Sequence, residues 1–345
     1  MNYTERYYQD LDAVWQSIPD RERLSGKTAV ITGATGLIGS SAADLLLRAN
    51  EACSTGIRLI FAGRSEERVK ERFLPYQPDR DFSFLPYDSE KPKELALTAD
   101  YIIHAAASAN PSDYACFPVN IMLTNFIGLN TLLRSAAEHP GTRVLYISSS
   151  EVYGMHESSE PFSEDDFGPI DILNPRSCYP SSKRCAETLC AAYRAQYHVD
   201  TVIVRPGHIY GPMSPASDSK AAAQFARCAA AGKDIVMKSA GSQIRSYCYA
   251  LDCASALLTV LIRGRSGEAY NISNPASIVT VRELAEAFAA AAGKRVVYED
   301  PTAAEKAGFT AMTNSSLNSE KLEALGWKGL FDLQRGVEST MARLS

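Results

Sequence analysis

The chain has 345 residues, of which 46% are hydrophobic and 22% are charged. This composition is typical of a globular protein and excludes a largely disordered or fibrous chain. At roughly 100–200 residues per domain, the length indicates about two structural units. The formal net charge is −5 and the sequence has no dense Lys/Arg cluster, which argues against a protein dedicated to binding nucleic acid.

The sequence contains no continuous apolar run of about 18 residues, the length that a membrane-spanning helix needs. Its first residues also lack the apolar core of a signal peptide. The eight cysteines are scattered and form no C-x-x-C pair, which favours free thiols over a disulfide or metal framework. We therefore expect a cytoplasmic protein with no membrane partner and no metal site.

The first half of the chain alternates between strand and helix patterns. Residues 3–18 are predicted to form an amphipathic helix, and an apolar strand then runs into a glycine-rich turn within 27–39. Helices are expected at 40–50, 66–73 and 118–138. Strands are expected at 57–62, at a segment that ends near 86–88, at 101–104 and at 143–148. This alternation predicts right-handed βαβ units and a doubly wound parallel sheet with helices on both faces.

From about residue 165 the pattern loosens into loops, and helices return at 179–197, 221–231 and 281–292. The sequence shows no internal repeat and no low-complexity tract. We therefore expect the second half to add elements to one end of the sheet.

The glycines of the first turn stand at GxxGxxG spacing between the first predicted strand and helix. Glycine is needed where the chain turns sharply and a pyrophosphate approaches bare backbone amides at a helix N-terminus. At this place in a βαβ series, the spacing predicts a dinucleotide-binding turn that contains Gly33, Thr35, Gly36, Leu37, Ile38 and Gly39.

The end of the second predicted strand bears on the choice between NAD and NADP. NAD sites usually carry an acidic residue there, but this chain has Ala62-Gly63-Arg64-Ser65, followed by Arg68 one helical turn later. Arg64 is suited to holding the 2′-phosphate of NADP, and it is equally suited to being a solvated arginine at a helix start. NAD and the alternative cofactor NADP both stay open.

Tyr179 and Lys183 are four residues apart, which places them on one face of a predicted helix. Upstream, a predicted strand ends in Ser148-Ser149-Ser150-Glu151. These residue types suit hydride transfer between a sugar carbon and a nicotinamide. Tyrosine acts as a base only when its pKa falls from about 10, and an ammonium group and a positive ring nearby favour that fall. A serine hydroxyl fixes the geometry.

Five motifs in this order resemble those of the extended short-chain dehydrogenases/reductases, which include nucleotide-sugar epimerases, dehydratases and decarboxylases: TGATGLIG, HAAA, SSSEVYG, YPSSK and RPGHIYGP. The likeness extends over residues 27–344. It implies that Ser149 is the catalytic hydroxyl, Tyr179 the base and Lys183 the residue that orients the tyrosine and the cofactor ribose. It further implies that the cofactor is contacted along its adenine and nicotinamide sides by Asp88, Ala105, Ala106 and Ala107, and that Asn125 matches a structural asparagine grouped with the cofactor site.

Within that family, the stretches SSSEVYG, NPRSCYPSSKR and GSQIRSYCYALD are most similar to UDP-glucuronate decarboxylases. In that chemistry the sugar C4 hydroxyl is oxidised, the carboxylate leaves as carbon dioxide and the ketone is reduced again. The resemblance adds Glu151 and Arg245 to the catalytic groups, since a carboxyl group passes protons and an arginine holds a carboxylate. The implied substrate contacts are Ser149, Ser150, Glu151, Arg176, His208 and Arg245.

Two residues depart from the decarboxylase pattern, because His208 replaces an asparagine and Met213 stands where an arginine is common. A 4-epimerase, a 4,6-dehydratase and an NADPH-dependent reductase of a keto-sugar therefore stay open. Ser150-Glu151 speaks against the dehydratase, which usually has Asp-Glu there. An alternative of another class is a catalytically silent nucleotide-sugar sensor.

Taken with the resemblance, the sequence predicts an α/β fold whose doubly wound parallel sheet is of the Rossmann type, with a smaller C-terminal α/β part that binds substrate. We expect an N-terminal helical extension at 1–26, a dinucleotide-binding domain at 27–204 and a mainly nucleotide-sugar-binding part at 205–345. The resemblance also implies a homodimer formed through the helices at 118–138 and 179–197.

Overall fold

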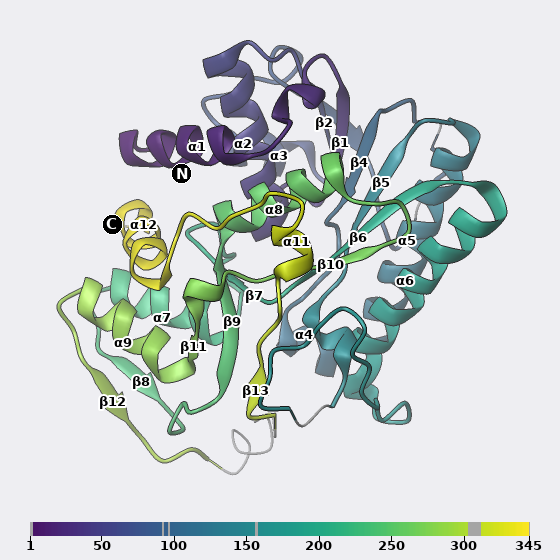
Figure 1. The fold of residues 1–345 in the computed structure, drawn as a ribbon. Helices are drawn as coiled ribbons and strands as arrows, with labels where there is room; N and C mark the ends of the chain where they lie inside the picture. Colours follow the sequence, from purple (N-terminus) through teal and green to yellow (C-terminus); the bar gives the residue numbers. More distant parts are fainter. Residues whose placement is uncertain (1–2, 92, 96, 156–157, 303–311, 345) are drawn as a thin grey trace.

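A computed structural model describes residues 3–91, 93–95, 97–155, 158–302 and 312–344 (Figure 1). Its centre is a seven-stranded sheet, parallel throughout, in the order β10-β6-β5-β4-β1-β2-β3. The strands are β1 (Thr28–Thr32), β2 (Arg58–Gly63), β3 (Ser83–Pro86), β4 (Tyr101–His104), β5 (Arg143–Ile147), β6 (Asp200–Pro206) and β10 (Ala269–Ile272). The predicted doubly wound fold is thereby confirmed.

The helices of this sheet are α2 (Leu37–Cys53), α3 (Glu66–Arg72), α4 (Pro111–Cys116), α5 (Pro118–Glu138), α6 (Cys178–Tyr197) and α8 (Ala250–Arg263). Most lie within a few residues of the predicted ranges, and the strand at 101–104 and the helix at 118–138 coincide with them. The helix after the glycine turn begins at Leu37 and not at Ser40, because Gly36 is its N-cap and already accepts the first helical hydrogen bond from Ser40. No helix in the described ranges has the length and apolar character needed to span a bilayer.

Side chains alternate across the sheet and so build two separate cores. Val30, Ile102 and Val144 pack in the core that contains residues of α5 and α6. Their neighbours, such as Ile31 and Ile103, pack in the core on the opposite face, with residues of α2 and α8. Successive side chains of a strand point to opposite faces of the sheet, and here both sets are apolar. Both faces of the sheet must therefore be covered.

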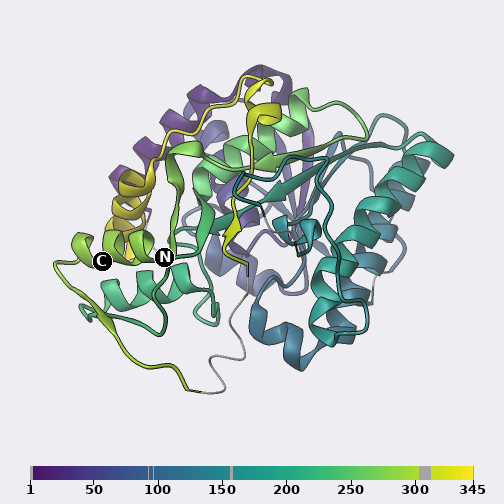
Figure 2. The same ribbon diagram turned by 60° about the horizontal axis from the view of Figure 1, so that its bottom comes forward.

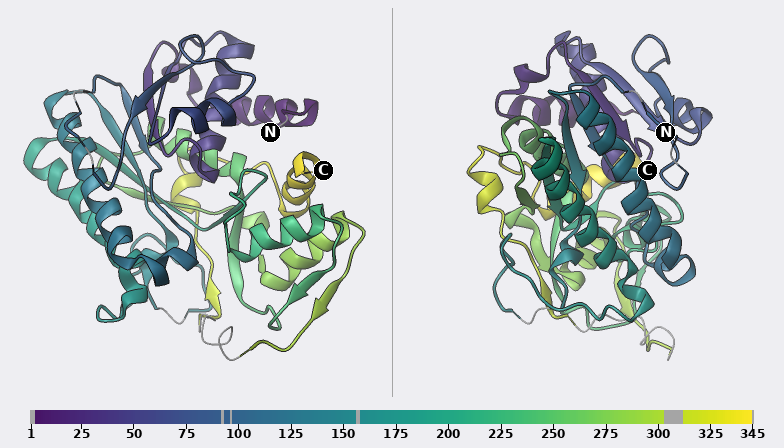
Figure 3. Two further views of the ribbon diagram at one scale, coloured as in Figure 1. Left: turned by 180° about the vertical axis from the view of Figure 1, so that it is seen from behind. Right: turned by 90° about the vertical axis from the view of Figure 1, so that its right-hand side faces the viewer.

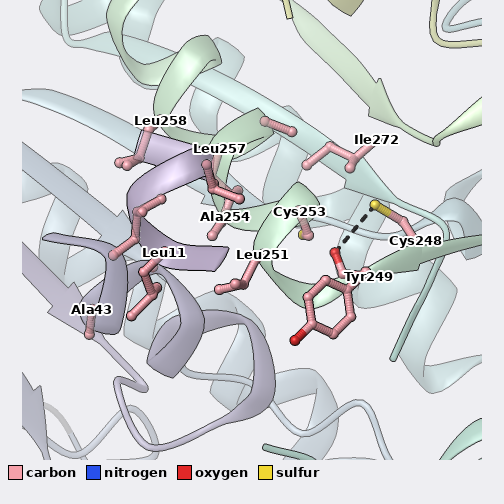
Figure 4. Close-up of a cluster of buried hydrophobic side chains, with 14 of the residues drawn as sticks. Leu11, Ala43, Cys248, Tyr249, Leu251, Cys253, Ala254, Leu257, Leu258 and Ile272 are labelled. Carbon is pink, nitrogen blue, oxygen red and sulfur yellow. Dashed lines mark hydrogen bonds between the residues drawn. The ribbon is translucent and has the colours of Figure 1, made fainter. Parts of the chain in front are cut away.

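Helix α8 lies deep inside the second core. Every residue from Ala250 to Ile262 is buried, as expected of a helix that is apolar on all sides. Figure 4 shows Leu11 of the N-terminal helix, Ala43 of α2 and Ile272 of β10 around Leu251, Ala254 and Leu257 of α8. The helix therefore joins the large sheet, the N-terminal helix and the rest of the C-terminal half.

A smaller C-terminal part lies at one side of the large sheet (Figures 1 and 3). In it β9 (Ile244–Tyr249) pairs with β7 (His208–Tyr210), β11 (Ile278–Thr280) and β13 (Asn314–Ser315), and β8 (Ile235–Met237) pairs with β12 (Val296–Tyr298). Its helices are α7 (Ala221–Ala230), α9 (Val281–Ala291), α11 (Glu320–Glu323) and α12 (Leu333–Leu344). Short 3₁₀ turns are η1 (Arg21–Leu24), η2 (Ser150–Tyr153), η3 (Pro175–Ser177) and η4 (Pro275–Ser277). Late residues also contribute β10 and α8 to the large sheet and its core.

The N-terminal helix α1 (Glu5–Ser17) lies beside α12, so that both ends of the chain meet (Figure 2). Asp44 of α2 is fully buried there and accepts hydrogen bonds from Tyr3 at 2.5 Å, Tyr7 at 2.8 Å and Arg72 at 2.6 Å. The guanidinium of Arg343 lies 3.8 Å from the same carboxylate and 3.7 Å from the centre of the Tyr7 ring. One carboxylate thus links α1, α2, α3 and α12.

Replacing Asp44 with Asn is expected to lower the free energy of unfolding by about 3–5 kcal/mol, because two buried arginines lose their counter-charge. Urea titration followed by circular dichroism measures this loss. Asp12→Asn is the matched control, since Asp12 pairs with Arg48 at a partly exposed site where the expected loss is under about 1 kcal/mol. Equal losses in the two variants would show that the Asp44 cluster is not a special source of stability.

Candidate active site

The candidate site lies where the strand order reverses, between the carboxyl ends of β1 and β4. In an open parallel sheet this is the point where a ligand can enter between diverging connections. The structure has a cleft of about 710 Å³ here. Of the residues that were predicted to contact the cofactor, those that line this cleft are Gly33, Thr35, Gly36, Arg64, Ala105, Ala106 and Ala107.

The glycine turn is built for close backbone approach. Gly33 has a φ of +67°, and a Cβ on it would lie 2.6 Å from the carbonyl oxygen of Ala105. A Cβ on Gly39 would overlap the carbonyl of Gly33, so the first turn of α2 also needs glycine. Gly33 thus lies tightly against the segment that follows β4, Gly39 lies tightly against Gly33, and the N-cap of α2 lines the cleft.

The outer end of the cleft is basic on the β2 side. Arg64, Ser65 and Arg68 line it, and Ser65 caps α3 by accepting the backbone N–H of Arg68. Glu90 lines the same cleft farther along the chain. No carboxylate stands at the end of β2, as the sequence indicated.

Asp88 and Asn125 have local hydrogen bonds of their own. Asp88 accepts the backbone N–H of Glu90 at 3.0 Å and lies between two residues that line the cleft, Tyr87 and Ser89. Asn125 is buried between α5 and α6, where its amide donates to the carbonyl of Ile121 at 2.9 Å and to Ser182 at 3.2 Å. The structure thus places Asn125 in a helix–helix contact.

A side-chain hydrogen bond joins the ends of β1 and β4. The hydroxyl of Thr32 lies 2.8 Å from Nδ1 of His104 and accepts the backbone N–H of Ala106 at 3.2 Å. Burial, together with the charge of Lys183, lowers the pKa of His104 to about 3. His104 is therefore a neutral structural group and carries no charge at neutral pH.

The serine, tyrosine and lysine predicted from the motifs come together at the end of β5. Ser149 follows this strand and caps η2, where its side chain accepts the backbone N–H of Glu151 at 3.2 Å, and its hydroxyl also lowers the pKa of Tyr179 on α6. Lys183, one helical turn after Tyr179, donates to the carbonyl of Ile147 at 2.7 Å and lies 5.7 Å from the centre of the Tyr179 ring. Both side chains are almost fully buried.

Burial shifts the pKa values of these two groups in opposite directions and so away from each other. It raises the pKa of the Tyr179 phenol, as does the charge of Glu151, whereas hydrogen bonds from Ser149 and Tyr114 lower it. Burial lowers the pKa of Lys183 from 10.5 to about 7. This differs from the expectation that Lys183 makes the phenol acidic, because desolvation penalises both charged forms more than the neighbouring charge favours them.

Three further side chains, Glu151, Arg176 and Tyr114, lie next to Tyr179. Arg176 of η3 forms an ion pair with Glu151, with N–O distances of 3.2 and 3.3 Å. The guanidinium of Arg176 also lies 4.6 Å above the ring of Tyr114 on α4. Tyr114 in turn stacks on Tyr179, with ring centres 4.6 Å apart and planes 16° apart. The sequence analysis missed Tyr114, since no motif or spacing connects it to Tyr179.

Arg245 and His208 lie on the paired strands β9 and β7 of the smaller part. Arg245 is buried and donates to the carbonyls of Ile244 at 2.8 Å and Met312 at 3.1 Å. The ring of His208 packs on Tyr247, and burial with the nearby charges of Arg245 and Lys220 lowers the His208 pKa to about 3. In the described residues neither side chain hydrogen-bonds to the Ser149–Tyr179 group.

The lowered pKa of Lys183 predicts a pH-dependent gain in stability for Lys183→Met. Between about pH 7 and 10.5 the unfolded chain holds a proton that the folded chain releases, so this lysine makes folding progressively less favourable as the pH falls through that window. Near pH 7 the variant is expected to be more stable by on the order of a few kcal/mol, with the difference shrinking to less than about 1 kcal/mol near pH 10. Thermal melting of both proteins from pH 6.5 to 10 tests this, and a constant difference across that range would contradict it.

Comparisons with known proteins agree with this geometry. The profile of the NAD dependent epimerase/dehydratase family matches residues 29–273. UDP-glucuronic acid decarboxylase 1 of Xenopus tropicalis is 29% identical over 324 residues, covering 93% of this chain and 72% of that protein. UDP-glucuronic acid decarboxylase 6 of Arabidopsis thaliana is 32% identical over 262 residues, covering 76% of this chain and 73% of that protein.

Solved structures show the same fold. UDP-glucose 4-epimerase of Thermotoga maritima, solved with UDP-glucose, has a TM-score of 0.75 at 22% identity, covering 92% of this chain and 98% of that chain. UDP-glucuronic acid 4-epimerase of Bacillus cereus, solved with UDP-glucuronic acid and NAD, has a TM-score of 0.75 at 20% identity with the same coverage. The chain belongs to the NAD-dependent epimerase/dehydratase family of nucleotide-sugar enzymes.

Proposed function

We propose that the protein is a UDP-glucuronate decarboxylase, or an enzyme of closely similar chemistry on another acidic nucleotide sugar. The observation that carries this proposal is the contact between Ser149, Tyr179 and Tyr114, with the Glu151–Arg176 ion pair directly beside it. Decarboxylases of this name are about 30% identical to the chain over most of its length, which supports the assignment.

The cleft fits a dinucleotide by its own geometry. Gly33 and Gly39 leave no room for a side chain where a pyrophosphate would approach the start of α2. Residues Gly33, Thr35, Gly36 and the first turn of α2 would hold the pyrophosphate, and Lys183 would contact the nicotinamide ribose. When bound, the nicotinamide supplies a hydride acceptor that later returns the hydride.

In this proposal each residue of the site has a separate task. Tyr179 takes the proton of the sugar C4 hydroxyl, and Ser149 donates a hydrogen bond that orients both oxygens. Arg245 would hold the substrate carboxylate, since its guanidinium has five N–H donors and two of them are used by backbone carbonyls. Glu151 would carry protons to and from the sugar, and Arg176 keeps its charge paired until then.

One observation favours a second candidate, an NADPH-dependent reductase of a nucleotide keto-sugar. Arg64 and Arg68 line the cleft at the end of β2, where an NAD site usually has a carboxylate. Net consumption of the reduced cofactor during turnover distinguishes this reductase from a decarboxylase, in which the cofactor ends as it began. The 4-epimerase and 4,6-dehydratase share the same first oxidation step and differ from the decarboxylase in their products.

Incubation with UDP-glucuronate and NAD or NADP is expected to release carbon dioxide and form a UDP-pentose or its 4-keto form. Tyr179→Phe is expected to lower kcat by about 10²–10⁴-fold while substrate binding is retained, because the ring stays and the base is lost. Tyr197→Phe is the matched control, since Tyr197 is an exposed tyrosine on the same helix. Binding of UDP-glucuronate without turnover by the wild type would favour the silent sensor.

Arg64 and Arg68 predict that the site accepts NADP as well as NAD. Arg64→Ala is expected to weaken NADP binding at least about tenfold and to leave NAD binding nearly unchanged, because only NADP carries the 2′-phosphate. Quenching of protein fluorescence measures both affinities. Arg295→Ala is the control, as Arg295 is an exposed arginine beside β12. Equal losses for both cofactors would refute a 2′-phosphate contact.

We also propose that residues 27–204 bind the dinucleotide, that 205–345 mainly bind the nucleotide sugar, and that the protein is a cytoplasmic homodimer. Support for the dimer comes from α5, whose outer face carries exposed apolar side chains: Val119, Met122, Leu123 and Phe126. This helix packs beside α6 at the surface, as Figure 3 shows. All eight cysteines are free thiols, which suits a reducing compartment.

A further inference from the structure

Arg343, near the end of α12, is a buried cation whose hydrogen-bond donors have no acceptor. Only 2% of its side chain is exposed. Its Nε, Nη1 and Nη2 atoms are all buried, and within the described ranges none of them has a hydrogen-bond partner. The guanidinium lies 3.7 Å from the centre of the Tyr7 ring and 4.8 Å from that of Tyr3. Because a ring face attracts a cation but accepts N–H bonds only weakly, the two tyrosines leave these donors unsatisfied.

The carboxylate of Asp44 does not supply the missing acceptor. Its nearest approach to Arg343 is 3.8 Å, which is too long for a hydrogen bond. Its Oδ1 already accepts from Tyr3, and its Oδ2 accepts from Tyr7 and Arg72. Buried donors are almost always satisfied in proteins, so an arginine with three unpartnered nitrogens indicates a bound water or ion.

The buried charges at this place do not balance either. Asp44 carries one negative charge, whereas Arg72 and Arg343 carry two positive charges, and all three side chains are at least nine-tenths buried. Two further carboxylates of α1 and α12 have arginine partners of their own, namely Asp10 with Arg335 and Glu338 with Arg6. An uncompensated buried charge is strongly disfavoured. A water molecule satisfies the N–H donors but leaves this charge unpaired, so a second negative charge is needed.

Two buried hydroxyl groups near Arg343 also lack partners. Ser339 lies one helical turn before it on the same face of α12, and Tyr249 ends β9. In the part of the chain that the structure describes, neither hydroxyl has a hydrogen-bond partner. Burial raises the pKa of Tyr249, and the charge of Arg343 acts against that rise. Guanidinium N–H and hydroxyl O–H groups are the donors that an anion accepts.

We propose that a single chloride-sized inorganic anion binds between α1, α2 and α12, held by the guanidinium of Arg343 with the hydroxyls of Ser339 and Tyr249 as further donors. The side chains of Arg343 and Asp44 are 2% and 0% exposed, so the site is enclosed and suits a monatomic anion. The anion supplies the missing negative charge where the two ends of the chain meet (Figure 2). Its expected effect is to stabilise that contact, independently of the reaction.

The test is the melting temperature of the full chain as chloride replaces gluconate at constant ionic strength. Constant ionic strength keeps general charge screening the same, and gluconate is too large for an enclosed site. The wild type is expected to melt at least about 3 °C higher when chloride rises from about 1 to about 100 mM, because the anion binds only the folded chain. The rise is expected to saturate, and bromide is expected to replace chloride.

Arg343→Gln is expected to melt at a lower temperature than the wild type and to lose the dependence on chloride. Arg48→Gln is the matched control, since Arg48 also stacks on a tyrosine between α1 and α2, 4.8 Å from the centre of the Tyr8 ring. Its three nitrogens all donate to carboxylates, those of Asp12 and Glu51, so this variant should keep the full chloride response.

Should Arg343→Gln fail to fold, Ser339→Ala tests the same site, because it removes one donor and leaves the charge. The midpoint of its chloride titration is expected to lie about three- to tenfold higher than that of the wild type. Crystals grown in bromide give a measurement that needs no variant. Anomalous scattering is expected to place a bromide ion in contact with the guanidinium of Arg343.

Three results would overturn the inference. A wild-type melting temperature that does not depend on chloride would mean that water or another part of the protein satisfies Arg343. An equal chloride response in the wild type and in Arg343→Gln, or in Ser339→Ala if that variant is used, would place the effect elsewhere. Bromide ions found only at other positions of the crystal would be adventitious ions only.

Discussion

The close backbone contact between Gly33 and the Ala105–Ala106 segment is the constraint on which the rest of the molecule depends. It sets how near the start of α2 comes to the end of β4, at the point where the strand order reverses. A single added methyl group would force these segments apart and widen the cleft. The glycine turn and the Thr32–His104 link both lie at the ends of β1 and β4, next to this contact.

The electrostatics of the site follow from burial. Tyr179 and Lys183 are each desolvated, so the neutral form of both is favoured: the pKa of the tyrosine rises and the pKa of the lysine falls. The charge of Glu151 raises the Tyr179 pKa further, whereas the neighbouring hydroxyls of Ser149 and Tyr114 lower it.

The sequence predicted the sheet well because its signals are local. Apolar runs such as 101–104 and the regular pattern of 118–138 depend only on neighbouring residues, and the glycine spacing marks the turn. The boundary at Leu37 was less accurate, since Gly36 caps the helix earlier than composition indicates. Tyr114 and the pairing of Glu151 with Arg176 were not predictable, because both are tertiary contacts between separate elements of the chain. The pKa of Tyr179 was misjudged because desolvation depends on packing that the sequence does not display.

Strand β10 belongs to the large sheet and helix α8 to its core, although both come late in the chain. This limits how the two parts of the molecule can move relative to each other. Strand β10 hydrogen-bonds to β6, and α8 is surrounded by both the sheet and the smaller part. A hinge that swung the two parts away from each other would tear this strand from its neighbour and empty the core around the helix. Ligand entry and product release are therefore expected to require rearrangement of surface loops, while the two parts keep their relative positions.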